Sequence, residues 1–317
     1  DRDFSAQMNS LFATLGNLHR HRGHFLNWYD TRTLEPLPPR YVSTVDSGNM
    51  AACLLALSQG AQRVGDEQIP RWEMWQGLLD LILLFEELLA ELDHTEARKV
   101  RQELQSFLQD VSRRISDARE KPAQWPELLI SIIEEGMPEM DRLLVRLAEK
   151  ESEVVSAEKL RRLRIYSDRF RSHLYSARRE IEICMPWLFL RLRPPEMLEE
   201  PDLSDQVREG CRKIIAGLPT VARLDELDAI ATHIQEQTKE FKELCRQNTD
   251  GTERMDEIIE WCNDFSRKLD QAGMATKALL IGFQGLYRSA QDFVDEMDFT
   301  FLFDPQRKVF HIGYNLE

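Results

Sequence analysis

The sequence predicts an all-α fold with a long helical bundle and a short C-terminal β-hairpin. Three observations support this. Apolar residues recur every three or four positions over long stretches, which is typical of amphipathic helices. Prolines and glycines fall between these stretches and mark their ends. Runs rich in β-branched and aromatic residues occur only after Met297.

The first 69 residues alternate helix and loop. Apolar spacing predicts a helix over 4–20 that Gly23 ends, followed by a proline-containing loop over 21–42. A second helix is expected from Ser43 or Thr44, whose hydroxyls can cap free N–H groups, to about Gly60. Asp46 then lies in the first turn, where the helix dipole favours a carboxylate.

Long helices fill the middle of the chain, and two short strands are expected at its end. The expected strands cover 299–303 and 308–314, with a turn over 304–307. Helices are expected over 71–93, 95–119, 126–150, 156–185, 205–218, 223–245 and 253–295. The predicted domains are therefore 1–69 with the first helices and a polar loop, 70–295 with the long-helix bundle, and 296–317 with the hairpin.

Charge and cysteine usage exclude several classes of function. A net charge of −14 disfavours nucleic acid and anionic membranes, which attract clustered Lys and Arg. Five cysteines without CxxC spacing argue against a disulfide framework and a zinc ribbon. The most apolar segment, 77–92, is too short for a membrane span and carries charges, so we expect a buried core helix there. We expect no metal and no cofactor.

The stretch HFLNWYD (24–30) is the first concentration of polar and aromatic groups. Trp28 and Tyr29 offer flat faces suited to a pyranose ring, and His24, Asn27 and Asp30 offer hydrogen bonds that would orient it. The alternative is structural: Trp28 and Tyr29 are half-buried aromatics that close a corner between helices.

The stretch VSTVDSGN (42–49) also allows two interpretations. In one, Ser43 or Thr44 caps a helix and Asp46 completes the capping arrangement. In the other, Asp46, Ser47 and Asn49 point from a helix N-terminus into a cavity, where they bind sugar hydroxyls or assist proton transfer. Glycosidic chemistry needs two carboxylates, and Asp30 and Asp46 are the weak candidates in this loop.

HRGHFLNWYDTRTLEPLPPRYVSTVDSGN (21–49) and FLFDPQRKVFHIGYNLE (301–317) resemble two signatures of the bacterial cyclic β-1,2-glucan synthases. The resemblance implies the N-terminal portion of their middle region, an (α/α)6 toroid similar to endo-β-1,2-glucanases. That region is an anomer-retaining transglycosylase, which cuts linear β-1,2-glucan and joins its ends into a ring. The family pattern places the main catalytic carboxylates beyond residue 317, so catalytic residues in this chain are unknown.

The resemblance also implies partners and a location. We expect linear β-1,2-glucan and the other domains of the same synthase as partners, in a soluble segment of a larger membrane protein on the cytoplasmic side of the bacterial inner membrane. The alternative is a non-catalytic helical scaffold that docks those domains. Glucan binding or cleft structure is assigned to His24, Asn27, Trp28, Tyr29, Asp30, Thr44, Asp46, Ser47, Asn49 and Tyr314.

Overall fold

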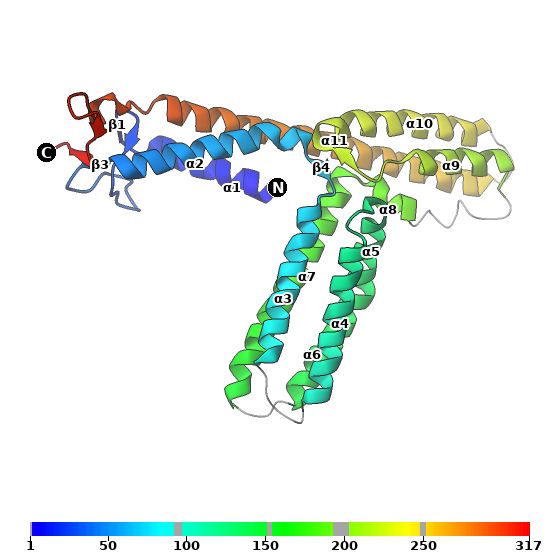
Figure 1. The fold of residues 1–317 in the computed structure, drawn as a ribbon. Coiled ribbons are helices and arrows are strands. Elements are labelled where there is room, and N and C mark those ends of the chain that lie inside the picture. Colours follow the sequence, from blue (N-terminus) through cyan, green and yellow to red (C-terminus); the bar gives the residue numbers. More distant parts are fainter. Residues whose placement is uncertain (1, 92–96, 151–153, 193–202, 248–251) are drawn as a thin grey trace. The chain divides into compact units, whose positions relative to one another are not determined.

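A computed structural model describes residues 2–91, 97–150, 154–192, 203–247 and 252–317. Within these residues the chain is predominantly helical, and its strands form only short two-stranded ladders (Figure 1). The all-α prediction is therefore confirmed. Closure into an (α/α)6 toroid stays a prediction.

The chain divides into two compact units. Unit 1 comprises Asp1–Glu67 and Thr276–Glu317, and unit 2 comprises Gln68–Ala275. The boundary at 275/276 lies inside a single helix, α11 (Thr252–Asp295), which contributes to both units. The predicted domains 1–69, 70–295 and 296–317 follow changes in sequence character, and they stay predictions.

Three helical segments form the body of unit 1: α1 (Arg2–Asn17), α2 (Thr44–Arg63, continued by the 3₁₀ turn Val64–Asp66) and the end of α11. The ring of Phe12 lies 5.6 Å from that of Phe293 on α11. Gly282 lets α1 approach α11 closely, because a Cβ there would meet the hydroxyl of buried Ser5 at 2.7 Å. Figure 1 shows the three segments side by side.

The helix α1 begins and ends earlier than predicted. It ends at Asn17, and Gly23 instead lies in a two-residue turn between two paired strands, β1 (Arg20–His21) and β2 (His24–Phe25). Both turn residues have positive φ, 51° for Arg22 and 82° for Gly23, as the tight hairpin turn requires. His21 and His24 are direct cross-strand partners in this hairpin and do not share a helical turn.

The C-terminal prediction is right about the turn and wrong about the extent of the strands. Asp304 accepts hydrogen bonds from the N–H groups of Gln306 and Arg307, at 2.9 and 3.0 Å, and so builds the hairpin turn. The residues before the hairpin form a 3₁₀ helix, because the Asp298 carboxylate caps the N–H of Thr300. The strands of unit 1 and this 3₁₀ helix are β1 (Arg20–His21), β2 (His24–Phe25), β3 (Tyr41–Ser43), η6 (Phe299–Leu302), β6 (Phe303–Asp304), β7 (Val309–Phe310) and β8 (Gly313–Asn315).

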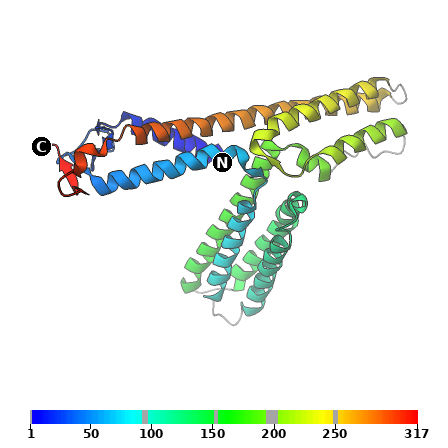
Figure 2. The same ribbon diagram turned by 45° about the horizontal axis from the view of Figure 1, so that its top comes forward.

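Unit 2 is built from helices near the predicted positions. These are α3 (Trp72–Ala90), α4 (Arg98–Asp117), α5 (Trp125–Ser131), α6 (Met137–Lys150), α7 (Val154–Cys184), α8 (Trp187–Leu192), α9 (Asp205–Gly217), α10 (Leu227–Gln247) and the start of α11. In Figure 2, α3 lies along α7 and α4, and α4 lies along α6. Leu78, Ile82 and Phe85 of α3 are almost fully buried, which confirms the predicted core helix.

Three details of unit 2 differ from the prediction. The helix expected over 126–150 contains one π-helical segment, η3 (Ile132–Gly136), and the short helix α8 was not predicted. The helix expected from 223 begins at Leu227, because a small ladder pairs β5 (Ala222–Arg223) with β4 (Gln68–Ile69) and the 3₁₀ turn Leu224–Glu226 follows. Within the described ranges, no helix is long and apolar enough to cross a membrane.

Candidate functional site

The two polar segments of the sequence meet in unit 1. The strand β3 pairs with β8 in antiparallel register, so that Val42 lies opposite Tyr314. Next to this ladder, the N–H of Thr44 donates to the carbonyl of Ile312 at 3.0 Å. Beneath it, Leu26, Val42 and Leu302 form a small buried cluster that joins both segments.

His24 lies where these two segments are in contact, a region here called the joint. Its side chain is 0% exposed, and its Nε2 lies 3.0 Å from the carbonyl oxygen of Asp298, which requires the proton on Nε2. The rings of Phe299 and Phe301 meet the imidazole edge-on at 4.8 and 5.5 Å. Burial lowers the pKa of His24, although Asp298 opposes this effect. An imidazole buried in this way contributes to packing between the two segments.

Tyr29 and Asp30 also satisfy their hydrogen bonds within the loop. The Tyr29 hydroxyl donates to the carbonyl of His19 at 2.7 Å and accepts the N–H of Leu26 at 2.8 Å. Burial raises the pKa of this phenol. The Asp30 carboxylate accepts the N–H groups of Thr33 and Arg32 at 2.9 and 2.8 Å, which lowers the pKa of Asp30. Both side chains therefore fold the loop.

The start of α2 follows the capping interpretation. Ser43 is the N-cap residue, and its hydroxyl accepts the N–H of Asp46 at 3.2 Å. Asp46 contributes its backbone to this cap, while its side chain stays exposed. The Thr44 hydroxyl is buried without a hydrogen-bond partner within the described residues.

Beside this helix start lies a cavity of about 490 Å³, here called the Trp28 cavity. Its volume falls in the range of ligand pockets, roughly 300–1,000 Å³. Trp28 lines the cavity and is 51% exposed, although large aromatic side chains are usually covered. The lining residues are Phe25, Leu26, Asn27, Trp28, Asp46, Ser47, Met50 and Met297.

Four of the predicted binding residues line this cavity: Asn27, Trp28, Asp46 and Ser47. The other predicted residues, which do not line it, are His24, Tyr29, Asp30, Thr44, Asn49 and Tyr314.

Tyr314 lies instead on the ladder beside the joint. Its ring is stacked on that of His21, with centroids 6.0 Å apart and planes 6° apart. The binding role of each predicted residue stays a prediction.

The sequence interpretation missed the apolar part of the cavity wall. Met50 lies one helical turn after Asp46, a spacing that places both on one face of α2 and was available from the sequence. Phe25 and Leu26 belong to the same loop as Trp28. Met297 comes from the far end of the chain, and no local pattern links it to this site.

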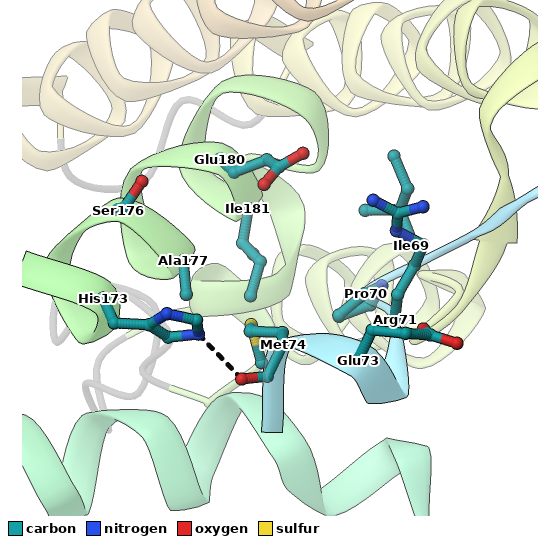
Figure 3. Close-up of a pocket in the computed structure, with 10 residues that line it drawn as sticks. All are labelled: Ile69, Pro70, Arg71, Glu73, Met74, His173, Ser176, Ala177, Glu180 and Ile181. Atoms are coloured by element: carbon teal, nitrogen blue, oxygen red, sulfur yellow. Dashed lines mark hydrogen bonds between the residues drawn. The ribbon is translucent and has the colours of Figure 1, made fainter. Parts of the chain in front are cut away.

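A smaller cavity of about 250 Å³ lies in unit 2 at the start of α3 (Figure 3). His173 of α7 extends toward the backbone of α3, and its Nε2 lies 2.8 Å from the carbonyl oxygen of Met74. Gly77 makes this approach possible, because a Cβ there would come within 2.8 Å of the imidazole. Since His173 is engaged with the backbone, we interpret this cavity as a packing feature between two helices.

The chemistry available at the Trp28 cavity is limited. Among the described residues that line it, Asp46 supplies the one carboxylate, whereas the two-carboxylate route to glycoside cleavage needs a second. Among the residues that the structure describes, no three His, Cys, Asp or Glu side chains are grouped so that they could hold a metal ion.

The Trp28 cavity thus combines an aromatic residue with an amide, a hydroxyl and a carboxylate, which is the kind of lining that suits a small polar ligand. A comparison with characterised proteins adds that a stretch of 52 residues is 52% identical to the cyclic beta-(1,2)-glucan synthase NdvB of Rhizobium meliloti (strain 1021). That stretch is 16% of this chain and about 2% of the length of the synthase. No family model matches the chain. The identity supports a relation to the synthase, and it does not show which of its regions this chain resembles.

Proposed function

We propose that unit 1 binds linear β-1,2-glucan in the Trp28 cavity, as part of a protein that processes this polymer. The observation that carries the proposal is the exposed indole of Trp28 beside polar side chains, in a chain with local identity to a cyclic β-1,2-glucan synthase. The ligand is a neutral polymer, which an acidic chain accepts without electrostatic cost.

Each polar residue of the cavity has a role in this proposal. The apolar face of a glucose ring lies against the indole of Trp28. The Asn27 amide both donates and accepts hydrogen bonds, as sugar hydroxyls do. The Asp46 carboxylate accepts hydrogen bonds from two sugar hydroxyls. Ser47 is a buried residue of the lining, and its hydroxyl both donates and accepts hydrogen bonds.

The reaction we propose for the complete protein is retaining transglycosylation. It cleaves one β-1,2 linkage and transfers the new glycosyl end to the other end of the same chain, which closes a ring. Asp46 alone does not supply the acid and the nucleophile that this route needs, so we assign glucan binding to this chain and leave the catalytic pair unassigned. The protein would act on the cytoplasmic side of the bacterial inner membrane, as part of a larger membrane protein.

Binding can be tested with protein labelled with 5-fluorotryptophan. Trp28 is the single Trp of unit 1, so its ¹⁹F resonance reports on this cavity alone. We expect the resonance to shift saturably when a linear β-1,2-gluco-oligosaccharide is added. Replacing Asn27 with Ala should weaken the apparent affinity about fivefold through loss of one hydrogen bond. An unmoved Trp28 resonance at saturating sugar would refute glucan binding in this cavity.

A second candidate function is that of a scaffold that docks other domains of the synthase. It is favoured by the exposed apolar side chains around β7 and β8 in unit 1, where Ile312 is 83% exposed. Such a patch is typical of a protein-contact surface. The other exposed members are Val309, Phe310 and Tyr314. If docking is the function, Ile312→Lys abolishes association with the remaining domains of the synthase and leaves the sugar response of Trp28 unchanged.

A further inference from the structure

A second cavity, of about 380 Å³, lies in unit 2 where α5, η3, α7, α8 and α11 meet, and is here called the Trp261 cavity. Its volume is also in the range of ligand pockets, roughly 300–1,000 Å³. It is remote in sequence from the polar loop of unit 1, and nothing in the glucan-binding proposal uses it.

Aromatic rings form the wall that α11 and α8 contribute. Trp261 and Phe265 are one turn apart on α11 and stack with centroids 5.4 Å apart and planes 12° apart. Phe265 is 4% exposed, so it anchors the indole of Trp261, which is only half-buried. On α8, Phe189 lies under the guanidinium of Arg178 at 5.8 Å. The cavity therefore holds a fixed aromatic surface beside a cation.

Charged groups of both signs complete the wall. The Arg178 Nε donates to the Glu182 carboxylate at 2.8 Å, which fixes both side chains along α7. Glu134 comes from the π-helical segment η3, and Asp264 and Lys268 come from α11. Wide π turns inside α-helices occur often at functional sites. The lining thus offers both hydrogen-bond donors and acceptors around a flat apolar face.

The composition of this lining selects the chemistry of a ligand. Three carboxylates against two cations disfavour a phosphate or a nucleic acid. Five charged side chains disfavour a purely apolar ligand, because such a ligand would remove water from these charges without replacing its hydrogen bonds, which costs free energy. A sugar meets both conditions: its hydroxyls donate and accept, and its ring presents an apolar C–H face to an indole.

We propose that the Trp261 cavity is a second saccharide-binding site, which takes a glucose unit of the same polymer outside the Trp28 cavity. Trp261 stacks on the sugar ring, while Glu182 and Lys268 bind its hydroxyls. The choice of polymer rests on the proposed function. A second site would raise the effective concentration of the polymer at the protein.

The test uses the 5-fluorotryptophan protein and a linear β-1,2-gluco-oligosaccharide at up to about 10 mM, a level suited to a weak site. We expect the Trp261 resonance, assigned with Trp261→Phe, to shift saturably. Trp75 and Trp187 are 0% exposed and serve as internal controls that should not move. Lys268→Ala should weaken the Trp261 response about fivefold, whereas the matched variant Lys99→Ala on α4 should not.

The outcomes separate this inference from the proposed function. A shift of Trp261 that persists in the Trp28→Phe variant supports the second site, whether or not Trp28 itself responds in the wild type. A shift of Trp28 alone overturns the second site and leaves the proposed function intact. An unmoved pair of resonances overturns both. Trp72 is another half-buried Trp of unit 2, and it does not line the cavity. The variant Trp72→Phe therefore controls for general effects of a Trp-to-Phe substitution.

Discussion

Replacing Gly23 with Ala should separate the two polar segments of unit 1. Gly23 has a φ of 82°, which costs a residue with a Cβ about 1–2 kcal/mol. A Cβ would also collide with the carbonyl of Glu296, so the hairpin or the facing segment must move. That movement strains the bond from the Asp298 N–H to the Arg22 carbonyl, at 3.0 Å. Loss of one such bond costs about 1 kcal/mol.

The expected loss for Gly23→Ala is therefore about 2–3 kcal/mol of unfolding free energy. With a urea dependence of about 1.5 kcal/mol per molar, the unfolding midpoint falls by about 1.3–2 M. The ¹⁹F resonance of Trp28 follows unit 1 specifically during urea unfolding. The resonances of the other tryptophans belong to unit 2 and report on its stability in the same samples.

Gly60→Ala is the matched control. Gly60 lies inside α2, where a Cβ would have no described atom within 4 Å, and its φ is not positive. This variant should gain about 0.5–1 kcal/mol, because Ala favours the helix over Gly. If Gly23→Ala unfolds at the wild-type midpoint or above it, the close approach of the hairpin to Glu296 does not stabilise unit 1, and our account of the joint is wrong.

Three further predictions concern the same joint and the cysteines. Ser43→Ala should lower the stability of unit 1 by about 1 kcal/mol through loss of the α2 cap, as measured by the Trp28 urea transition. Because the pKa of His24 is lowered in the folded chain, the unfolded chain binds more protons, so unit 1 should lose stability as the pH falls below the ordinary histidine value of 6.5. His24→Phe should flatten that dependence, and an unchanged slope would exclude His24 as its source. Burial raises the pKa of Cys245 to about 11 and of Cys262 to about 12. A thiol reagent at pH 8 should therefore label exposed Cys53 first. Early labelling of Cys245 or Cys262 would contradict their burial.

The helices could be predicted from the sequence because each buries one apolar stripe. Leu78, Ile82 and Phe85 repeat at helical spacing, and α3 buries all three. The hairpin at 20–25 could not be predicted in the same way, because a glycine after a helical pattern signals equally a helix end and a turn with positive φ. In this chain Gly23 lies in the hairpin turn and has a positive φ.

The pairing of β3 with β8 could not be predicted from local patterns. The two strands lie near opposite ends of the chain, and each is three residues long. Such a ladder depends on the buried cluster beneath it, where Val42 and Leu302 are 0% exposed. Residue spacing within either segment carries no information on this contact, and for the same reason Met297 was not foreseen as part of the cavity wall.

Two aspartates, Asp30 in the loop and Asp46 in the first turn of α2, provide a final test of the role of these polar side chains. A polar side chain in a loop is often hydrogen-bonded to the backbone of the same loop and is then not free to bind a ligand. Asp30 does this, and its lowered pKa means that the folded loop favours the charged carboxylate; Asp46 keeps its carboxylate exposed at the cavity. Asp30→Asn should therefore lower the urea midpoint of unit 1. Asp46→Asn should lower the midpoint less, by no more than the small helix-dipole effect, and should weaken the Trp28 response to β-1,2-gluco-oligosaccharide about fivefold. If Asp30→Asn instead weakens binding at an unchanged midpoint, Asp30 contacts the glucan, and the division between loop-forming and ligand-facing residues drawn from their hydrogen bonds is wrong.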